Sequence, residues 1–224
     1  MAFHKSITIN PSTTLHLWKI TEDFNTLFRE VKLKDVSLAR VECMKSESHQ
    51  KGFLAVRMLL QYLGYSDFDL YYDDFGKPHL RKEARSKSQE ARQEKDEVHI
   101  SISHSHGFSG VLLSDQNVGL DIEQLKQKTL NIASRFMDMS HLENLTEEEK
   151  IKKATVVWGI KEVVFKIKNE VGISFPDHIS EDDFCFEDKK TTAKLEFNNQ
   201  TGYFETTFDS VEDYIYVCGF QKLP

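Results

Sequence analysis

The chain has 224 residues with 29 Lys or Arg against 36 Asp or Glu, so its formal net charge is −7. The 16 Phe, only 4 Pro and 10 Gly exclude disordered, collagen-like and low-complexity chains. No apolar run approaches the ~20 residues of a membrane span, the N-terminus lacks a signal-peptide pattern, and net acidity disfavours nucleic acid. These observations predict a cytoplasmic protein with neither a membrane nor a nucleic-acid partner.

The first half of the sequence predicts a strand, two helices and then a run of strands. Alternating apolar residues predict a strand over residues 15–20. Helical spacing of apolar residues predicts a helix that begins within 21–24 and a second one over 48–63, with Gly64 as its C-terminal cap. Strand-like segments follow at 69–73, 99–103 and 110–113, with a turn at 76–78.

The segment from Arg81 to Glu97 interrupts this run of strands. It holds 11 charged residues in 17, six basic and five acidic, and its only apolar residues are two alanines. No face of such a segment can be buried, which predicts a solvated excursion between two strands. A partner-binding arm is the alternative interpretation.

The second half repeats the order of the first. It predicts a strand over 118–123, a short helix over 131–137 and a long helix capped by Thr146 and Glu149 that ends near 171–172. Strand-like segments follow at 183–186, 194–197, 202–208 and 214–220. The shared order predicts an α+β fold made of a pseudo-twofold pair of similar α/β lobes, residues 1–115 and 116–224, with a functional site between them.

The strand over 118–123 carries two acidic residues. Strand alternation places Leu120 and Ile122 on one face, predicted to be the core side, and Asp121 and Glu123 on the other. Two neighbouring carboxylates repel each other unless a cation joins them, and oxygen-only ligands suit Mg²⁺ or Mn²⁺. A solvent-facing acidic edge is the alternative.

The long helix contains a charged face within an otherwise apolar segment. Trp158, Glu162 and Lys166 are four residues apart and share this face, and Lys161 flanks it. An exposed pair between Glu162 and Lys166 is one interpretation. The apolar residues around the rest of the helix instead predict close packing, in which charges need a partner or a function. A carboxylate and two lysines beside a metal suit a phosphate-bearing substrate.

Residues 100–107 gather hydroxyl and imidazole groups at the end of a predicted strand. Ser103 and His104 belong to this cluster, and such groups can donate to phosphate oxygens. A serine hydrolase is disfavoured because the chain has no G-x-S-x-G elbow. A structural hydrogen-bonding turn is the alternative.

The runs ISISHS, VGLDIE and WGIKEVVFK occur in this order and resemble the signatures of the 4′-phosphopantetheinyl transferases. They are most similar to the two-lobed, Sfp-type branch of that family. The turn Gly76-Lys77-Pro78 and the run FLAVRMLL over 53–60 resemble two further family motifs. The resemblance spans about residues 50–170.

The resemblance implies a fold and an activity. The fold would be that of the two-lobed family members, with coenzyme A and Mg²⁺ bound between the lobes of a monomer. The activity would be the Mg²⁺-dependent transfer of 4′-phosphopantetheine from coenzyme A to a serine of an apo acyl or peptidyl carrier protein, with release of 3′,5′-ADP. Two alternatives are a non-catalytic homologue that binds coenzyme A or a carrier protein, and a Mg²⁺-dependent phosphohydrolase.

The resemblance also implies roles for the residues of the second half. Asp121, Glu123 and Glu162 would hold Mg²⁺, or Mn²⁺ in its place, and Asp121 and Glu162 count among the catalytic residues. Glu162 would also serve as general base for the incoming serine. Lys166 would stabilise the charge on the phosphates and the leaving group, with help from Lys161.

In the first half the resemblance implies contacts to coenzyme A. Ser103 and His104 would contact the 3′-phosphate, and Lys77 and Arg57 the adenylate end. One position departs from the family pattern RFFxxxE, because His141 stands where its acid is expected and Glu143 follows two residues later. The motifs identify neither the carrier protein nor the surface on which it docks.

Overall fold

The computed structural model describes residues 3–81 and 98–222. The chain divides into two compact units, Met1–Gln116 and Asn117–Pro224. The predicted solvated excursion over 81–97 lies, apart from Arg81, outside the described residues.

The N-terminal unit is built on a four-stranded antiparallel sheet. Its strands follow the order β1-β2-β6-β5, and a separate hairpin pairs β3 with β4. The strands are β1 (Phe3–Asn10), β2 (Thr13–Lys19), β3 (Leu70–Tyr72), β4 (Pro78–Leu80), β5 (His99–Ser105) and β6 (Phe108–Ser114).

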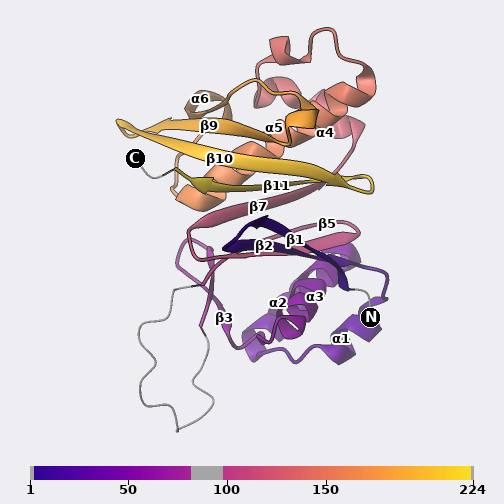
Figure 1. Ribbon diagram of the computed structural model, residues 1–224. Helices are drawn as coiled ribbons and strands as arrows, with labels where there is room; N and C mark the ends of the chain where they lie inside the picture. Colours follow the sequence, from indigo (N-terminus) through magenta and orange to yellow (C-terminus); the bar gives the residue numbers. More distant parts are fainter. Residues whose placement is uncertain (1–2, 82–97, 223–224) are drawn as a thin grey trace. The chain divides into compact units, whose positions relative to one another are not determined.

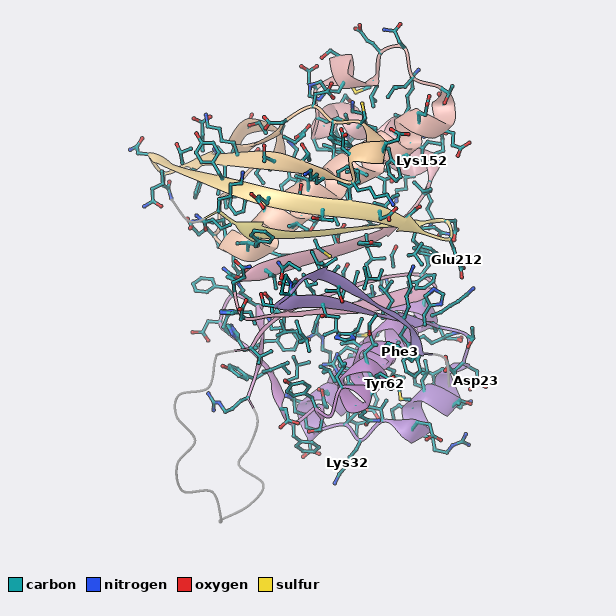
Figure 2. All side chains as sticks on the ribbon, in the orientation of Figure 1. Phe3, Asp23, Lys32, Tyr62, Lys152 and Glu212 are labelled. Atoms are coloured by element: carbon teal, nitrogen blue, oxygen red, sulfur yellow. The ribbon has the colours of Figure 1, made fainter. Side chains whose placement is uncertain are left out.

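Three helices lie on one side of this sheet (Figure 1). They are α1 (Phe24–Glu30), α2 (Asp35–Cys43) and α3 (Glu47–Tyr62). Ser46 caps α3 through its hydroxyl, and every residue from Gly52 to Leu60 is buried. Tyr62 stacks on Phe3 of β1 with ring centroids 4.3 Å apart (Figure 2). The helix α3 is therefore the centre of this unit's core.

The C-terminal unit has a five-stranded antiparallel sheet in the order β7-β11-β10-β9-β8. In chain order its strands are β7 (Val118–Gln124), β8 (Ile179–Glu181), β9 (Lys190–Phe197), β10 (Gln200–Val211) and β11 (Tyr214–Gln221). The strands β7 and β8 are thus the two edges of this sheet.

One long helix, α5 (Glu147–Lys168), packs against this sheet. The predicted capping box of Thr146 and Glu149 is confirmed, because each side chain accepts a hydrogen bond from the other residue's backbone N–H. The helix ends at Asn169, whose φ of 52° is left-handed, a few residues before the predicted end. Shorter elements complete the unit: α4 (Gln127–Asn131), η1 (Ala133–Arg135), η2 (Met139–Leu142), α6 (Phe175–His178) and η3 (Phe186–Asp188).

Two predictions of local structure were wrong, and two elements were not predicted. The short helix predicted over 131–137 lies earlier, as α4, and is followed by a 3₁₀ turn. The strand predicted over 183–186 does not form, since its first residues are irregular and η3 begins at Phe186. The sequence also gave no signal for β1 and α2, because most of their residues are polar or half-buried and show no regular apolar face.

Each unit combines an antiparallel sheet with helices on it, which is compatible with the α+β class. Within the part of the chain that the structure describes, no helix is long and apolar enough to cross a membrane.

Candidate active site

The strand β7 and the helix α5 bring three predicted residues of the C-terminal unit together. Lys166 of α5 reaches β7, where its ammonium lies 2.9 Å from the Oδ1 atom of Asp121 and donates to the Leu120 carbonyl at 2.8 Å. Only 6% of the Asp121 side chain is exposed, against 29% for Lys166. A charged carboxylate with this little exposure needs a cation, and Lys166 supplies it.

Glu162 lies one helical turn before Lys166 and is half-buried. Burial is the first cause that raises the pKa of Glu162, and the negative charge of Asp121 is the second. Lys166 acts in the opposite direction and lowers this pKa. Asp121, Glu162 and Lys166 therefore form one electrostatic cluster, in which two carboxylates compete for one ammonium.

The predicted burial of Leu120 and Ile122 on β7 is confirmed, but the helix α5 covers the other face of the strand. Asp121 faces the helix: a Cβ built on Gly159 of α5 would stand 3.6 Å from the Oδ2 atom of Asp121. Leu120 and Ile122 point to the opposite face of the sheet and are not members of the core that α5 covers. Alternation gave the correct pairs of residues, and the acidic pair lies on the helix side, where Lys166 contacts Asp121.

Gly159 allows α5 to approach the sheet this closely. A Cβ at this position would come within 2.5 Å of Val217 on β11, which pairs directly with Asp121 of β7. Any larger residue at 159 would push the helix away from the strand that carries Asp121. The glycine of the run WGIKEVVFK thus sets the distance between Asp121 and the helix that carries Glu162.

The fit of this cluster to a divalent cation can be judged from its donors. Asp121 and Glu162 are both oxygen donors, the charge of Asp121 raises the pKa of Glu162, and such a pair gains from a nearby Mg²⁺. Glu123 follows two residues later on the same face of β7 and is half-buried. Within residues 3–81 and 98–222, however, no three His, Cys, Asp or Glu side chains are arranged to hold a metal ion. The donors therefore suit Mg²⁺ chemically, but the predicted set of three is not assembled as a closed site.

Lys161 points away from this cluster. Its ammonium forms an ion pair of 2.7 Å with Glu181 at the end of β8 and donates to the Ile179 carbonyl. The two charged side chains are 3% and 4% exposed. These internal partners give no support to the predicted contact of Lys161 with coenzyme A.

His141 stands beside the same buried carboxylate. Its Nδ1 atom lies 3.9 Å from the Oε1 atom of Glu181, and about a quarter of its side chain is exposed. The position where the family pattern has an acid therefore carries an imidazole that faces an acid from β8. Glu143, the other residue considered for that role, is exposed just after η2.

Arg57 is buried within the N-terminal unit. Its Nε atom donates to Asp67 at 3.0 Å, and these side chains are 3% and 0% exposed. Its guanidinium also lies 3.5 Å from the centroid of the Phe53 ring. A salt bridge with this little exposure is typical of a residue that holds the fold, and it gives no support to the predicted contact with the adenylate end.

Ser103 and His104 lie next to each other on β5 but face opposite sides of the sheet. The His104 ring packs over α3, 2.9 Å from where a Cβ on Gly52 would stand, and it remains exposed. Ser103 is 8% exposed and pairs across the sheet with Gly110. Their joint contact with a 3′-phosphate remains a prediction.

Lys77 belongs to the turn that leads into β4. Asp73 shapes this turn, because its carboxylate accepts hydrogen bonds from the backbone N–H groups of Phe75 and Lys77. Lys77 is half-buried, and burial lowers the pKa of its ammonium while the charge of Asp73 raises it. The turn thus presents a partly desolvated cation, which suits an anionic ligand.

The comparisons with known proteins were made on the whole chain. No family model matches it. The chain is similar to the 4′-phosphopantetheinyl transferase Sfp of Bacillus subtilis (strain 168), with 27% identity over 140 residues. The match covers 59% of this chain and 57% of that relative, so the chain spans less than two thirds of the relative's length.

Proposed function

We propose that this protein is a 4′-phosphopantetheinyl transferase of the two-lobed, Sfp-type branch. It would transfer the 4′-phosphopantetheine group of coenzyme A to a serine of an apo acyl or peptidyl carrier protein. The observation that carries the proposal is the cluster of Asp121, Glu162 and Lys166, which lies in the runs VGLDIE and WGIKEVVFK. The similarity to Sfp agrees with this chemistry.

The proposed reaction is an attack of the carrier's serine oxygen on the β-phosphorus of coenzyme A. The new bond joins this oxygen to the β-phosphorus, and the bond from the β-phosphorus to the bridging oxygen breaks, which releases 3′,5′-ADP. Glu162 accepts the serine proton, directly or through a water. Lys166 stabilises the negative charge that grows on the phosphate oxygens.

Mg²⁺ fits this proposal through Asp121 and Glu162, with Glu123 as the remaining candidate ligand. When bound, the cation would neutralise the pyrophosphate and act as a Lewis acid. Mg²⁺ in phosphate sites often uses one or two carboxylates and completes its shell with waters and phosphate oxygens. Two clustered carboxylates are therefore enough for the proposed role, and Mn²⁺ has the same ligand preference.

The N-terminal unit would supply contacts to the nucleotide end of coenzyme A. Lys77 is the best supported of the predicted residues, because it is a half-buried cation on an ordered turn. Ser103 and His104 remain proposed contacts to the 3′-phosphate. We leave Arg57 and Lys161 out of the coenzyme contacts, since each is paired with a buried carboxylate and only 3% exposed, whereas Lys166 is 29% exposed.

The test is a transfer assay with coenzyme A, Mg²⁺ and several apo carrier proteins, each followed by mass spectrometry of the intact carrier. We expect the carrier to gain the mass of one phosphopantetheine group. A folded protein that binds coenzyme A but modifies no carrier would favour the non-catalytic homologue. Hydrolysis of coenzyme A with the carrier unmodified would favour the phosphohydrolase.

Two variants connect the assay to the cluster. Asp121→Asn and Glu162→Gln should each lower the transfer rate by about 10²-fold or more, since they remove a metal ligand or the base. Asp209→Asn is the matched control, because Asp209 forms an exposed ion pair with Lys189 in the same unit. Full activity of Asp121→Asn would contradict the proposed cluster.

A further inference from the structure

We infer that Glu181 is a positioning residue: through its buried ion pair with Lys161 it fixes the rotation of α5 and thereby places Glu162 and Lys166 at Asp121. This inference rests on the proposed function, because it explains how the same cluster is held in its reactive geometry. Glu181 would touch neither coenzyme A nor the carrier protein.

The two lysines of α5 reach opposite edges of one sheet. Lys166 contacts Asp121 and the Leu120 carbonyl on the edge strand β7. Lys161 contacts Glu181 and the Ile179 carbonyl on the other edge strand, β8. The three inner strands, β11, β10 and β9, lie between these edges. The helix is thus fastened at both sides of the sheet on which it packs.

The angular positions of these lysines make the two fastenings sensitive to rotation. Successive residues of an α-helix are about 100° apart, so Lys161 and Lys166 are separated by about 140° around the axis. A rotation of α5 that shortened one contact would stretch the other. Glu162 follows Lys161 directly, so its direction from the helix axis is fixed by the same pair.

Small rotations matter at this site. A rotation of about 10° moves an atom about 5 Å from the helix axis by about 0.9 Å. A misplacement of about 1 Å at a reacting group can lower a rate by about 10²-fold. Apolar packing constrains rotation less sharply than a close charged contact, because the hydrophobic effect has no direction, whereas the attraction between two charges weakens as they separate.

The burial of the ion pair shows that it is more than a surface contact. The side chains of Lys161 and Glu181 are 3% and 4% exposed, whereas the ion pair of Lys222 with Glu205 in the same unit is 41% and 50% exposed. A buried ion pair adds little net stability over apolar residues of similar volume. What it adds is a defined geometry, which supports a role in positioning.

The charged surroundings of Glu181 support the same interpretation. The Nδ1 atom of His141 lies 3.9 Å from the other carboxylate oxygen of Glu181, whereas the ammonium of Lys161 lies 2.7 Å from Oε2. Glu181 therefore has Lys161 as its nearest cation. Its carboxylate therefore pairs with a lysine of α5, the helix that carries Glu162.

The experiment compares three variants of the full chain in the transfer assay. Glu181→Gln removes the charge of Glu181 and keeps its shape. The pair Lys161→Met with Glu181→Leu replaces the buried ion pair by apolar residues. Glu205→Gln makes the same chemical change as the first variant in the exposed ion pair and serves as its control. Thermal unfolding, kcat and KM for coenzyme A are measured for each.

We expect Glu181→Gln to lower kcat about tenfold to a hundredfold, with KM for coenzyme A changed by less than about threefold. The double variant should unfold at or above the wild-type temperature while its kcat stays low. This separation of activity from stability is the result that a merely structural ion pair would not give. Glu205→Gln should retain the wild-type kcat.

Three outcomes distinguish the hypotheses. An active wild type whose kcat is unchanged by Glu181→Gln would overturn the positioning role but leave the proposed function intact. A double variant with both the wild-type kcat and the wild-type stability would also overturn the positioning role. The double variant provides this test even if Glu181→Gln does not fold. A folded wild type that transfers nothing would overturn the proposed function, on which this inference rests.

Discussion

The backbone carbonyl oxygen of Val163 lies 2.6 Å from the point where a Cβ on Gly119 would stand. Gly119 is on β7, two residues before Asp121, and Val163 directly follows Glu162 on α5. The strand and the helix can therefore meet at this separation only because residue 119 has no side chain. The glycine of the run VGLDIE is explained by this contact, which sets the distance between the two carboxylates.

We predict that Gly119→Ala lowers the free energy of unfolding by about 1–3 kcal/mol, as expected for overpacking against backbone. The transfer rate should fall as well, since a shift of β7 moves Asp121 away from Glu162. Urea unfolding and the transfer assay measure the two effects. Gly202→Ala is the control, because a Cβ there would meet only side-chain atoms of Phe204 and Gln221, at 3.3 Å or more. Equal losses in both variants would contradict the prediction.

The raised pKa of Glu162 predicts that its ionised form lowers the free energy of unfolding, so that stability depends on pH. Because this pKa is raised by burial and by Asp121, the folded protein binds the proton of Glu162 more tightly than the unfolded chain does. The unfolding free energy must then fall as pH rises from the ordinary glutamate value of about 4.3 through the raised pKa. Above that window the cost is fully present.

Glu162→Gln removes this cost, since glutamine mimics the protonated glutamate. We expect the variant to unfold at a higher temperature than the wild type at pH 7 without divalent cations, and the difference to vanish near pH 4. Added Mg²⁺ should stabilise the wild type more than the variant, because bound ligand stabilises the folded state. Calorimetry with and without Mg²⁺ measures both effects. An advantage of the same size at pH 4 and pH 7 would refute the explanation.

The sequence signals for the members of this cluster are local. Spacing by four placed Glu162 and Lys166 on one helix face, and spacing by two placed Asp121 and Glu123 on one strand face. Alternation could not tell which face the helix would cover. That face is seen only in tertiary contacts, such as the one between Asp121 and Lys166, which lie 45 residues apart along the chain.

The partners of Arg57 and Lys161 could not be predicted for a related reason. Asp67 and Glu181 belong to segments without a regular apolar pattern, one in the loop before β3 and one in a strand of three residues. The resemblance to the family motifs suggested a ligand contact for each basic residue, whereas the fold pairs each of them internally. A buried ion pair is a tertiary contact, and periodicity carries no information about it.

The lowered pKa of Lys77 predicts that coenzyme A binds more weakly at alkaline pH. Burial lowers the pKa of its ammonium, so this lysine loses its positive charge at a lower pH than an exposed lysine, whose pKa is about 10.4. Affinity for coenzyme A should decline over the same range. Lys77→Arg should remove this decline, because a guanidinium stays charged to above about pH 12. Isothermal titration between about pH 7.5 and 10 compares the two proteins. Identical pH curves would exclude a contact between Lys77 and the coenzyme.

For Arg57, a structural role and a coenzyme contact predict different effects of a substitution on stability and on coenzyme A binding. Removal of one partner from a buried ion pair leaves the other charge uncompensated, which costs about 3–5 kcal/mol. We therefore expect Arg57→Met to lower the free energy of unfolding by about that amount, since Asp67 would remain fully buried. Arg29→Met is the control. Arg29 pairs with Glu30 at 3.7 Å and is 73% exposed, so its substitution should lower the free energy of unfolding by less than about 1 kcal/mol.

Urea unfolding measures the stability of both variants, and titration of the folded fraction with coenzyme A measures binding. If Arg57→Met kept the wild-type stability but bound coenzyme A weakly, the guanidinium would serve the coenzyme. A structural role requires a loss of stability, because the variant breaks the buried ion pair with Asp67.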